Sequence, residues 1–299
     1  MVRKGDYKEG ILLMKIVDTP NFDVVIIGAG ANGSHFFRNL LQDISCYGSR
    51  LKNCKFTIVD GDQVEKKNLN NQLFDSDDVG AYKVQALVDR YGEHYQVDCA
   101  AVATYVTTLE DLEKLFRGPK GLQRILVGCV DNNRTRQLMH EYFESSSDLI
   151  YVDVGVEGVI LKDELPKEMD DKESIIMSSG FSGQIVIGFR KDNTTVLPSV
   201  ADVYPTILTD FESAFPTQAC AEVKDNPQRV ETNKMAAQFA NIILNNLFHT
   251  GELLQEEITF NARLGTSVVS YIDVRKEREY IKLIREENNN EQQQLCIVS

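Results

Sequence analysis

The segment GAGANG at residues 28–33 constrains the fold of this chain more than any other feature. It follows a short apolar run at residues 22–27, typical of a buried parallel strand, and precedes a helical pattern at residues 32–41. In that context GxGxxG predicts a strand–turn–helix unit that holds a phosphate at the helix N-terminus. Gly28 allows the tight turn, Gly30 lets the backbone approach the phosphate, and Gly33 allows close helix–strand packing. A tight turn without a ligand is the alternative, and the motif alone does not separate NAD, FAD, S-adenosylmethionine and ATP.

Strands and helices alternate through the first half of the chain. Further strands are predicted at residues 56–59, 98–105, 125–130 and 149–154, and helices at residues 84–91, 109–116 and 135–143. This alternation predicts a Rossmann-like, doubly wound, mostly parallel α/β sheet whose ligand lies at the carboxyl ends of the strands. Asp60 ends the second strand, where an acidic side chain usually holds the ribose hydroxyls. It lies farther from the glycine loop than the roughly 20 residues of a dehydrogenase.

The second half of the chain has a different pattern. A strand is predicted at residues 183–189, a helix at 231–247 and a hairpin at 258–261 and 267–274, with an irregular excursion at 199–216. These elements predict an antiparallel C-terminal extension of the sheet. We divide the chain into an N-terminal segment (1–21), one domain (22–275) with halves 22–155 and 180–275, and a charged, flexible tail (276–299).

Composition narrows the class of protein. The net charge of -13 argues against a nucleic-acid surface, which needs clustered Lys and Arg. The sequence has no apolar run long enough to span a membrane and no pattern of a signal peptide. Six scattered cysteines without a CxxC pair predict a reduced, cytoplasmic protein. They are Cys46, Cys54, Cys99, Cys129, Cys220 and Cys296.

Three segments beyond the glycine loop carry a more specific pattern. They are residues 59–74 (VDGDQVEKKNLNNQLF), 78–83 (DVGAYK) and 128–136 (GCVDNNRTR). They resemble the D-x-D-x-V-x-x-x-N-L-x-R-Q, D-[IV]-G-x-x-K and D-N-x-x-x-R segments of the ThiF/MoeB and ubiquitin-activating enzyme family. Their order and spacing match over roughly residues 22–155.

Four later segments extend the resemblance to about residue 275. They are residues 182–188 (SGQIVIG), 197–202 (LPSVAD), 219–222 (ACAE) and 230–233 (VETN). They are similar to segments of the ThiF-type proteins of plasmid PRTRC gene clusters. On this resemblance residues 22–155 form the nucleotide-binding half, and residues 180–275 the half that binds the carboxylate and its protein.

The resemblance implies ATP-dependent adenylation of the C-terminal glycine carboxylate of a ubiquitin-like protein, with release of pyrophosphate. It further implies a conjugating-enzyme-like acceptor and a homodimer. Lys83 would be the main catalytic cation, and Asp131 would place Mg²⁺, a hard ion suited to a carboxylate. The residues expected to contact the nucleotide are Gly28, Gly30, Gly33, Asp60, Asn68, Asn71, Gln72 and Lys83.

Each of these charged residues also has a plain structural interpretation. Lys83 would then be a surface lysine, Asp131 a cap of the following helix, and Asp60 a solvated carboxylate at a strand end. Asp62 and Arg136 fit a supporting role better than direct contact with the nucleotide.

The chain departs from the family at two points. Asn71 stands where the family has Arg, and an amide does not reproduce the fork of a guanidinium. Lys66, Lys67, Arg134 or a residue of a second subunit could supply the missing cation. The family's zinc-binding CxxC pairs are absent, so no structural zinc is expected.

Cys220 is the candidate for a covalent thioester step, because it follows a loop and precedes a helix where the family keeps a cysteine. A packed cysteine without covalent function is the alternative. Three other functions compete with activation of a ubiquitin-like protein: a non-catalytic scaffold, which Asn71 favours, adenylation of a peptide or small-molecule carboxylate, and an NAD-dependent oxidoreductase. The last leaves Lys83 and Asp131 unexplained.

Overall fold

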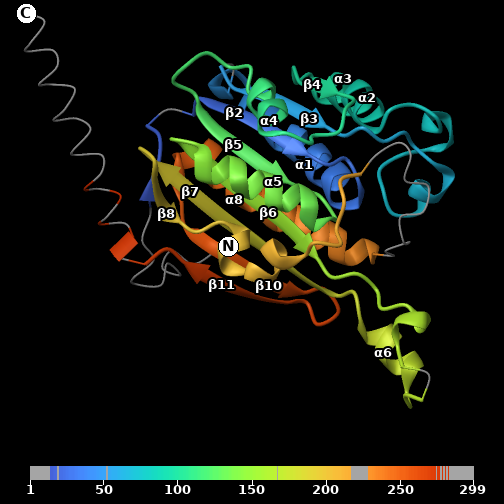
Figure 1. Cartoon of the computed structure of the whole chain (residues 1–299). Coiled ribbons are helices and arrows are strands. Elements are labelled where there is room, and N and C mark those ends of the chain that lie inside the picture. The colour runs from blue at the N-terminus through green and yellow to red at the C-terminus, as the bar shows by residue number, and fades with distance from the viewer. Residues whose placement is uncertain are drawn as a thin grey trace, which may run out of the picture.

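One central sheet with helices on both faces organises the chain (Figure 1). The computed structural model describes residues 14–18, 20–51, 53–166, 168–216 and 228–273, together with residues 275, 276, 278, 280 and 282. The strands are β1 (Met14–Lys15), β2 (Phe22–Ile27), β3 (Lys55–Val59), β4 (Ala100–Val102), β5 (Gln123–Gly128), β6 (Leu149–Val156), β7 (Ser182–Lys191), β8 (Thr194–Leu197), β9 (Glu252–Leu253), β10 (Gln255–Asn261) and β11 (Thr266–Tyr271).

The main sheet has the order β11-β10-β7-β6-β5-β2-β3-β4, with β8 paired to β7, and a separate ladder joins β1 to β9. The strands from β4 to β6 in this order are all parallel. From β6 onward β7, β10 and β11 pair antiparallel, as does β8 with β7. The predicted parallel α/β sheet with an antiparallel C-terminal extension is therefore confirmed.

The helices are α1 (Ala31–Tyr47), α2 (Lys83–Leu87), α3 (Glu93–Tyr95), α4 (Leu109–Leu115), α5 (Asn133–Ser145), α6 (Lys172–Ser178), α7 (Val200–Val203) and α8 (Val230–Thr250). A π turn, Val88–Gly92, joins α2 to α3. Short 3-10 turns lie at Gly48–Leu51, Lys66–Asn70 (η2), Ser76–Asp78, Lys162–Glu164 and Pro205–Thr209 (η6). None of the helices in these described ranges combines the length and the apolar character needed to cross a bilayer.

Two apolar cores lie on opposite faces of the sheet. Side chains alternate along β2: Val24 and Ile26 enter the first core, and Val25 and Ile27 enter the second. The first core packs α1, α2 and α8 against the sheet, and the second packs α4, α5 and α7. Because both faces are buried, five of the six residues at 22–27 are apolar. The exception is the buried Asp23, whose Oδ2 accepts from the N–H of Gly118 at 2.6 Å.

Helices α1 and α8 pack closely although they come from opposite ends of the domain. The facing side of α8 carries the small, fully buried Ala236, Ala237 and Ala240, which allow close approach. Asn241 Nδ2 donates to the carbonyl of Phe36 at 3.2 Å, so this interface is also held by a buried hydrogen bond. The first core therefore takes residues from both halves of the chain.

The structure adds elements that the sequence patterns did not predict. The excursion at 199–216 contains α7 and η6, and α6 projects from the body of the domain (Figure 1). β8 forms because Asp192 and Asn193 adopt positive φ angles of 47° and 63°, which matches a two-residue hairpin turn. The predicted strand at 98–105 shortens to β4, and the first helix extends to Tyr47.

Candidate functional site

The strand order reverses between β2 and β5, since β3 lies on one side of β2 and β5 on the other. In doubly wound sheets the ligand binds at this switch point, outside the carboxyl ends of the strands. The glycine loop follows β2, Asp60 follows β3, and Asp131 follows β5. The fold therefore brings these three predicted elements to one edge of the sheet.

The three glycines of the loop differ in whether the surrounding protein requires glycine at that position. Gly28 has a φ of 100°, and a Cβ there would lie 2.6 Å from the carbonyl oxygen of Cys129. A Cβ on Gly33 would lie 2.0 Å from the carbonyl oxygen of Gly28. At Gly30, the N-cap of α1, a Cβ would meet no atom within 4 Å. Protein packing explains Gly28 and Gly33, whereas it leaves open space at Gly30.

Asp60 fastens the glycine loop to the end of β3. The backbone N–H of Ala29 donates to its Oδ2 at 2.6 Å, and the N–H of Asp62 donates to its Oδ1 at 2.8 Å. Burial raises the pKa of Asp60, and the charge of Lys83 opposes that shift. Each carboxylate oxygen has a second lone pair, so Asp60 can still accept from a ribose hydroxyl.

Lys83 is buried, with 6% exposure, so the surface interpretation of this lysine is wrong. Its Nζ donates to Asp62 Oδ2 at 2.8 Å, and the hydroxyl of Tyr105 donates to Asp62 Oδ1 at 2.6 Å. Burial lowers the pKa of Lys83, but the charges of Asp60 and Asp62 outweigh it, and the net pKa shift is upward. Lys83 therefore keeps its charge at the edge of the sheet, and Asp62 supports it, as expected.

Asp131 presents an exposed carboxylate across from Lys83. Its charge also raises the pKa of Lys83, which places the two groups within electrostatic reach. The cap of α5 is Asn132, whose Oδ1 accepts from the N–H of Thr135 at 2.8 Å, so the capping interpretation of Asp131 is wrong. Within the described residues Asp131 makes no hydrogen bond or ion pair, and its oxygens suit Mg²⁺.

Arg136 holds the loop that carries Asp131. Its Nη2 donates to the carbonyl of Val130 at 2.7 Å, and its Nε lies 3.2 Å from Oδ2 of Asp153. Asp153 is fully buried and also accepts from the hydroxyl of Tyr151 at 3.1 Å. Arg136 is thus engaged with the protein, in agreement with the supporting role predicted for it.

The turn η2 brings Asn68, Asn71 and Gln72 to the start of α1. Asn68 is buried, and its Oδ1 accepts from the N–H of Glu65 at 2.8 Å. Gln72 keeps a buried Oε1 without a hydrogen-bond partner. The backbone of Asn71 hydrogen-bonds His35, whose pKa falls to about 4 through burial and through the charges of Lys234 and Arg38.

The cations considered as replacements for the family arginine lie at the surface. Lys66 and Lys67 are exposed, and Lys67 pairs with Glu65 at 3.4 Å. The guanidinium of Arg134 lies over the ring of Phe215 at 4.7 Å. Cys220 lies outside the described residues. Sequence reasoning missed Tyr105 and His35, because neither stands in a motif and only the fold brings them to Asp62 and Asn71.

The fold and this edge of the sheet define a Rossmann-like α/β domain with a glycine loop at the start of α1. The model of the ThiF family matches residues 16–243, more than half of the chain, and the chain belongs to that family. No curated protein gives a match to this sequence.

Solved structures show the same fold. A structure of PaaA has 16% sequence identity and a TM-score of 0.53, covering 85% of this chain and 65% of that one. The structure of E. coli MccB with ATP has 15% identity and a TM-score of 0.54, covering 86% and 65%. That of MccB with N-formylated MccA has 15% identity and a TM-score of 0.52, covering 86% and 66%. The chain thus spans somewhat less than two thirds of the length of these proteins.

Proposed function

We propose that this protein binds ATP and adenylates the C-terminal glycine carboxylate of a ubiquitin-like protein. Membership of the ThiF family supports adenylyl transfer as the reaction class. A structure of MccB, which shares the fold, contains ATP. In the reaction a carboxylate oxygen bonds to the α-phosphorus, the bond from that phosphorus to the bridging oxygen breaks, and pyrophosphate leaves.

The observation that carries the proposal is the buried, charged Lys83 beside a glycine loop that packing leaves open at Gly30. Negative charge builds on the phosphoryl oxygens and on the departing pyrophosphate. A fixed cation and preorganised donors stabilise that charge without a reorganisation cost. Lys83 would supply the cation, and the N-terminal amides of α1 would supply the donors.

Mg²⁺ would neutralise phosphate charge when bound. The exposed, unbonded carboxylate of Asp131 would hold it, since oxygen ligands suit this ion. Asp60 would bind the ribose hydroxyls while its backbone bonds keep the glycine loop in place. Asn68 and Gln72 would line the phosphate path, where the amide Nε2 of Gln72 would donate to a phosphate oxygen.

Three alternatives compete with this proposal. A peptide carboxylate is favoured as acceptor by the MccB structures that contain the peptide substrate MccA. A non-catalytic scaffold is favoured by Asn71, since the structure leaves Lys66, Lys67 and Arg134 at the surface. An NAD-dependent oxidoreductase would use the same glycines and Asp60, but it gives Lys83 and Asp131 no role.

The test is exchange of labelled pyrophosphate into ATP, with purified protein and a ubiquitin-like protein that ends in glycine. We expect exchange that needs both Mg²⁺ and the partner, and that Lys83→Met and Asp131→Ala abolish. Lys114→Met, an exposed lysine on α4, is the matched control and should exchange as wild type does. Exchange with Lys83→Met at the wild-type rate would overturn the role of Lys83.

Nucleotide binding separates the alternatives. A thermal shift with Mg-ATP and none with NAD supports adenylation, whereas a shift with NAD alone supports the oxidoreductase. Binding of neither supports the scaffold. Exchange with a free peptide, and none with a ubiquitin-like protein, would assign the peptide as acceptor.

We further propose that the protein acts in the cytoplasm as a homodimer, and that Cys220 receives the acyl group before a conjugating-enzyme-like acceptor. Light scattering after size exclusion tests the dimer. A thioester adduct on a non-reducing gel, lost in Cys220→Ser while pyrophosphate exchange persists, tests the cysteine. Exchange without any adduct would leave adenylation as the whole activity.

A further inference from the structure

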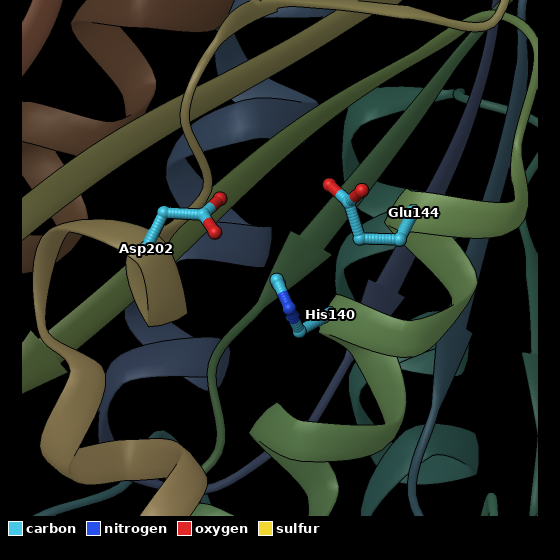
Figure 2. Close-up of side chains that lie close together, drawn as sticks. All are labelled: His140, Glu144 and Asp202. Carbon is cyan, nitrogen blue, oxygen red and sulfur yellow. The ribbon is translucent and has the colours of Figure 1, made fainter.

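A second group of polar side chains lies on the α5 and α7 side of the sheet, apart from the loop that holds Asp131. His140 and Glu144 come from α5, and Asp202 comes from α7 (Figure 2). One ligand atom of each lies within 4.8 Å of the others. Figure 2 shows the two carboxylates pointing toward each other across the imidazole. His140 lies two turns along α5 from Asn133, which is about 10 Å.

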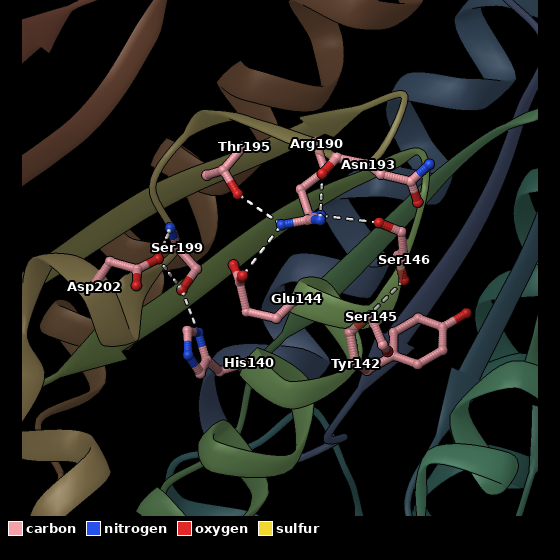
Figure 3. Close-up of polar contacts among 10 residues, drawn as sticks. All are labelled: His140, Tyr142, Glu144, Ser145, Ser146, Arg190, Asn193, Thr195, Ser199 and Asp202. Atoms are coloured by element: carbon pink, nitrogen blue, oxygen red, sulfur yellow. Dashed lines mark hydrogen bonds and ion pairs between the residues drawn. The ribbon is translucent and has the colours of Figure 1, made fainter.

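Local structure fixes all three side chains. His140 and Glu144 are four residues apart in α5, so they lie on one face of the helix. Asp202 is held from the other element, because the N–H and the hydroxyl of Ser199 donate to its Oδ2 at 2.8 and 3.0 Å. Ser199 is fully buried, and its Oγ lies 2.8 Å from Nδ1 of His140 (Figure 3). The cluster is therefore preorganised across two elements.

Arg190 forms an ion pair with only one of the two carboxylates in the cluster. Arg190 Nη1 lies 3.2 Å from Glu144 Oε2. The same guanidinium donates to the carbonyls of Ser146 and Asn193 and to the hydroxyl of Thr195 (Figure 3). Arg190 thus stays anchored without Glu144. Asp202 has no cationic partner within the described residues.

Each of the three side chains also keeps an atom that no hydrogen bond within the described residues uses. These atoms are Nε2 of His140, Oε1 of Glu144 and Oδ1 of Asp202. Two carboxylates facing one imidazole, with a single cation at one side, leave unbalanced negative charge. A bound cation would relieve it.

We propose that His140, Glu144 and Asp202 bind a divalent transition-metal ion, with Zn²⁺ as the best fit. One imidazole nitrogen and two carboxylate oxygens form a borderline donor set that favours zinc over Mg²⁺ or Ca²⁺. Ligands about 2.1 Å from a tetrahedral ion lie roughly 3.4 Å apart, so small side-chain rotations close the cluster. Three protein ligands leave the fourth position to water. This site shares no residue with the proposed adenylation site and does not depend on it.

The ion would clamp the base of the segment at residues 199–216 onto α5. That segment continues through η6 to Asp210, whose Oδ2 accepts from Nδ2 of Asn133 at 2.8 Å. The N–H of Arg134 donates to the hydroxyl of Ser213 at 3.1 Å. The segment therefore reaches the loop of Asp131, and metal binding at its base would order it there.

Zinc binding to the full-length, nucleotide-free protein tests the proposal by calorimetry. All proteins carry Cys46→Ser, because Cys46 is an exposed thiol that could bind zinc. We expect one zinc per chain, and an affinity at least tenfold weaker in His140→Ala, Glu144→Gln and Asp202→Asn. Glu141→Gln, an exposed carboxylate next to His140, is the matched control and should bind as the parent does. No binding at 100 μM zinc, or equal binding by all variants, would overturn the proposal.

Two further readouts test the site, and the first needs no variant. Co²⁺ in the parent protein should give the visible bands of nitrogen and oxygen coordination, whereas a thiolate charge-transfer band would assign the ion to cysteine and refute the site. Hydrogen exchange at residues 199–216 should slow on zinc addition in the parent and stay unchanged in His140→Ala. Unchanged exchange in both proteins would refute the clamp.

Discussion

Two substitutions in the glycine loop should separate the effects on folding from the effects on ligand binding. Gly33→Ala should lower stability, and Gly30→Ala should weaken binding of the nucleotide. A methyl group at Gly33 would lie 2.0 Å from the carbonyl oxygen of Gly28, and neither backbone can retreat from the packed turn. A methyl group at Gly30 meets no protein atom within 4 Å. Gly30 has φ -73° and ψ -150°, an extended conformation that alanine also adopts.

The two substitutions should therefore differ in stability. We expect Gly33→Ala to cost about 3 kcal/mol or more, because overpacking against backbone forces the turn to shift. That corresponds to a fall in Tm of about 6 °C or more for a domain of this size. Gly30→Ala should change stability by about 1 kcal/mol or less, the scale of an N-cap exchange.

Ligand binding, in contrast, should be weakened by Gly30→Ala. At a concentration of 100 times Kd, Mg-ATP adds about 2.7 kcal/mol to the stability of the wild type. If the methyl group of Gly30→Ala keeps the phosphate from the backbone and weakens binding tenfold, the added stability falls to about 1.4 kcal/mol, and a hundredfold loss leaves about 0.4 kcal/mol.

Thermal unfolding with and without Mg-ATP measures both quantities in one experiment, with circular dichroism to show that Gly30→Ala is folded. Gly48→Ala is not a suitable control, because Gly48 has a positive φ of 51°. Full Mg-ATP stabilisation in Gly30→Ala would refute the argument that Gly30 is kept for a phosphate. A stable Gly33→Ala would refute the packing argument.

The other predictions concern buried charges. His35 has a pKa of about 4, below its ordinary 6.5, so its stabilising contribution is present above pH 6.5 and is lost as pH falls toward 4. Between pH 7 and 4, unfolding experiments should show His35→Gln losing about 3 kcal/mol less stability than wild type. Arg136→Met should cost about 3–5 kcal/mol, because it leaves the buried Asp153 unpaired, and Arg136→Met with Asp153→Leu should cost less by chemical denaturation. Tyr105→Phe should cost about 1.5–3 kcal/mol by the same measurement, since it removes a hydrogen bond to a charged group.

The fold could be predicted where burial or close packing determines the residue type, as in apolar strands and tight glycine turns. The run at 22–27 is apolar except at Asp23, because both faces of β2 are covered. Glycine is required at 28 and 33, because a Cβ at either position would collide with a backbone carbonyl oxygen. β8 escaped prediction although its turn residues Asp192 and Asn193 are typical of a two-residue hairpin, because its four residues are too few for a clear period.

The candidate site was predictable where a motif names a residue and not where the fold alone creates a contact. Lys83 and Asp131 stand in motifs, and the structure brings both to the edge that holds Gly30. Tyr105 follows a strand and carries no motif, yet its hydroxyl bonds Asp62. The partners of Asp202 come from α5 and from Ser199, and no spacing in the sequence relates α5 to α7.

The packing of α8 against α1 has a consequence for the protein while it is being made. Nδ2 of Asn245 donates to Oδ2 of Asp43, 202 residues earlier in the chain. Ribosomes add roughly 5–20 residues per second, so about 10–40 s pass between the synthesis of these two side chains. During that interval the apolar face of α1, with Phe36, Phe37 and Leu40, has emerged without the helix that covers it. Until α8 is made, the N-terminal half of the domain therefore exposes apolar surface of the kind that leads nascent chains to aggregate or to bind chaperones.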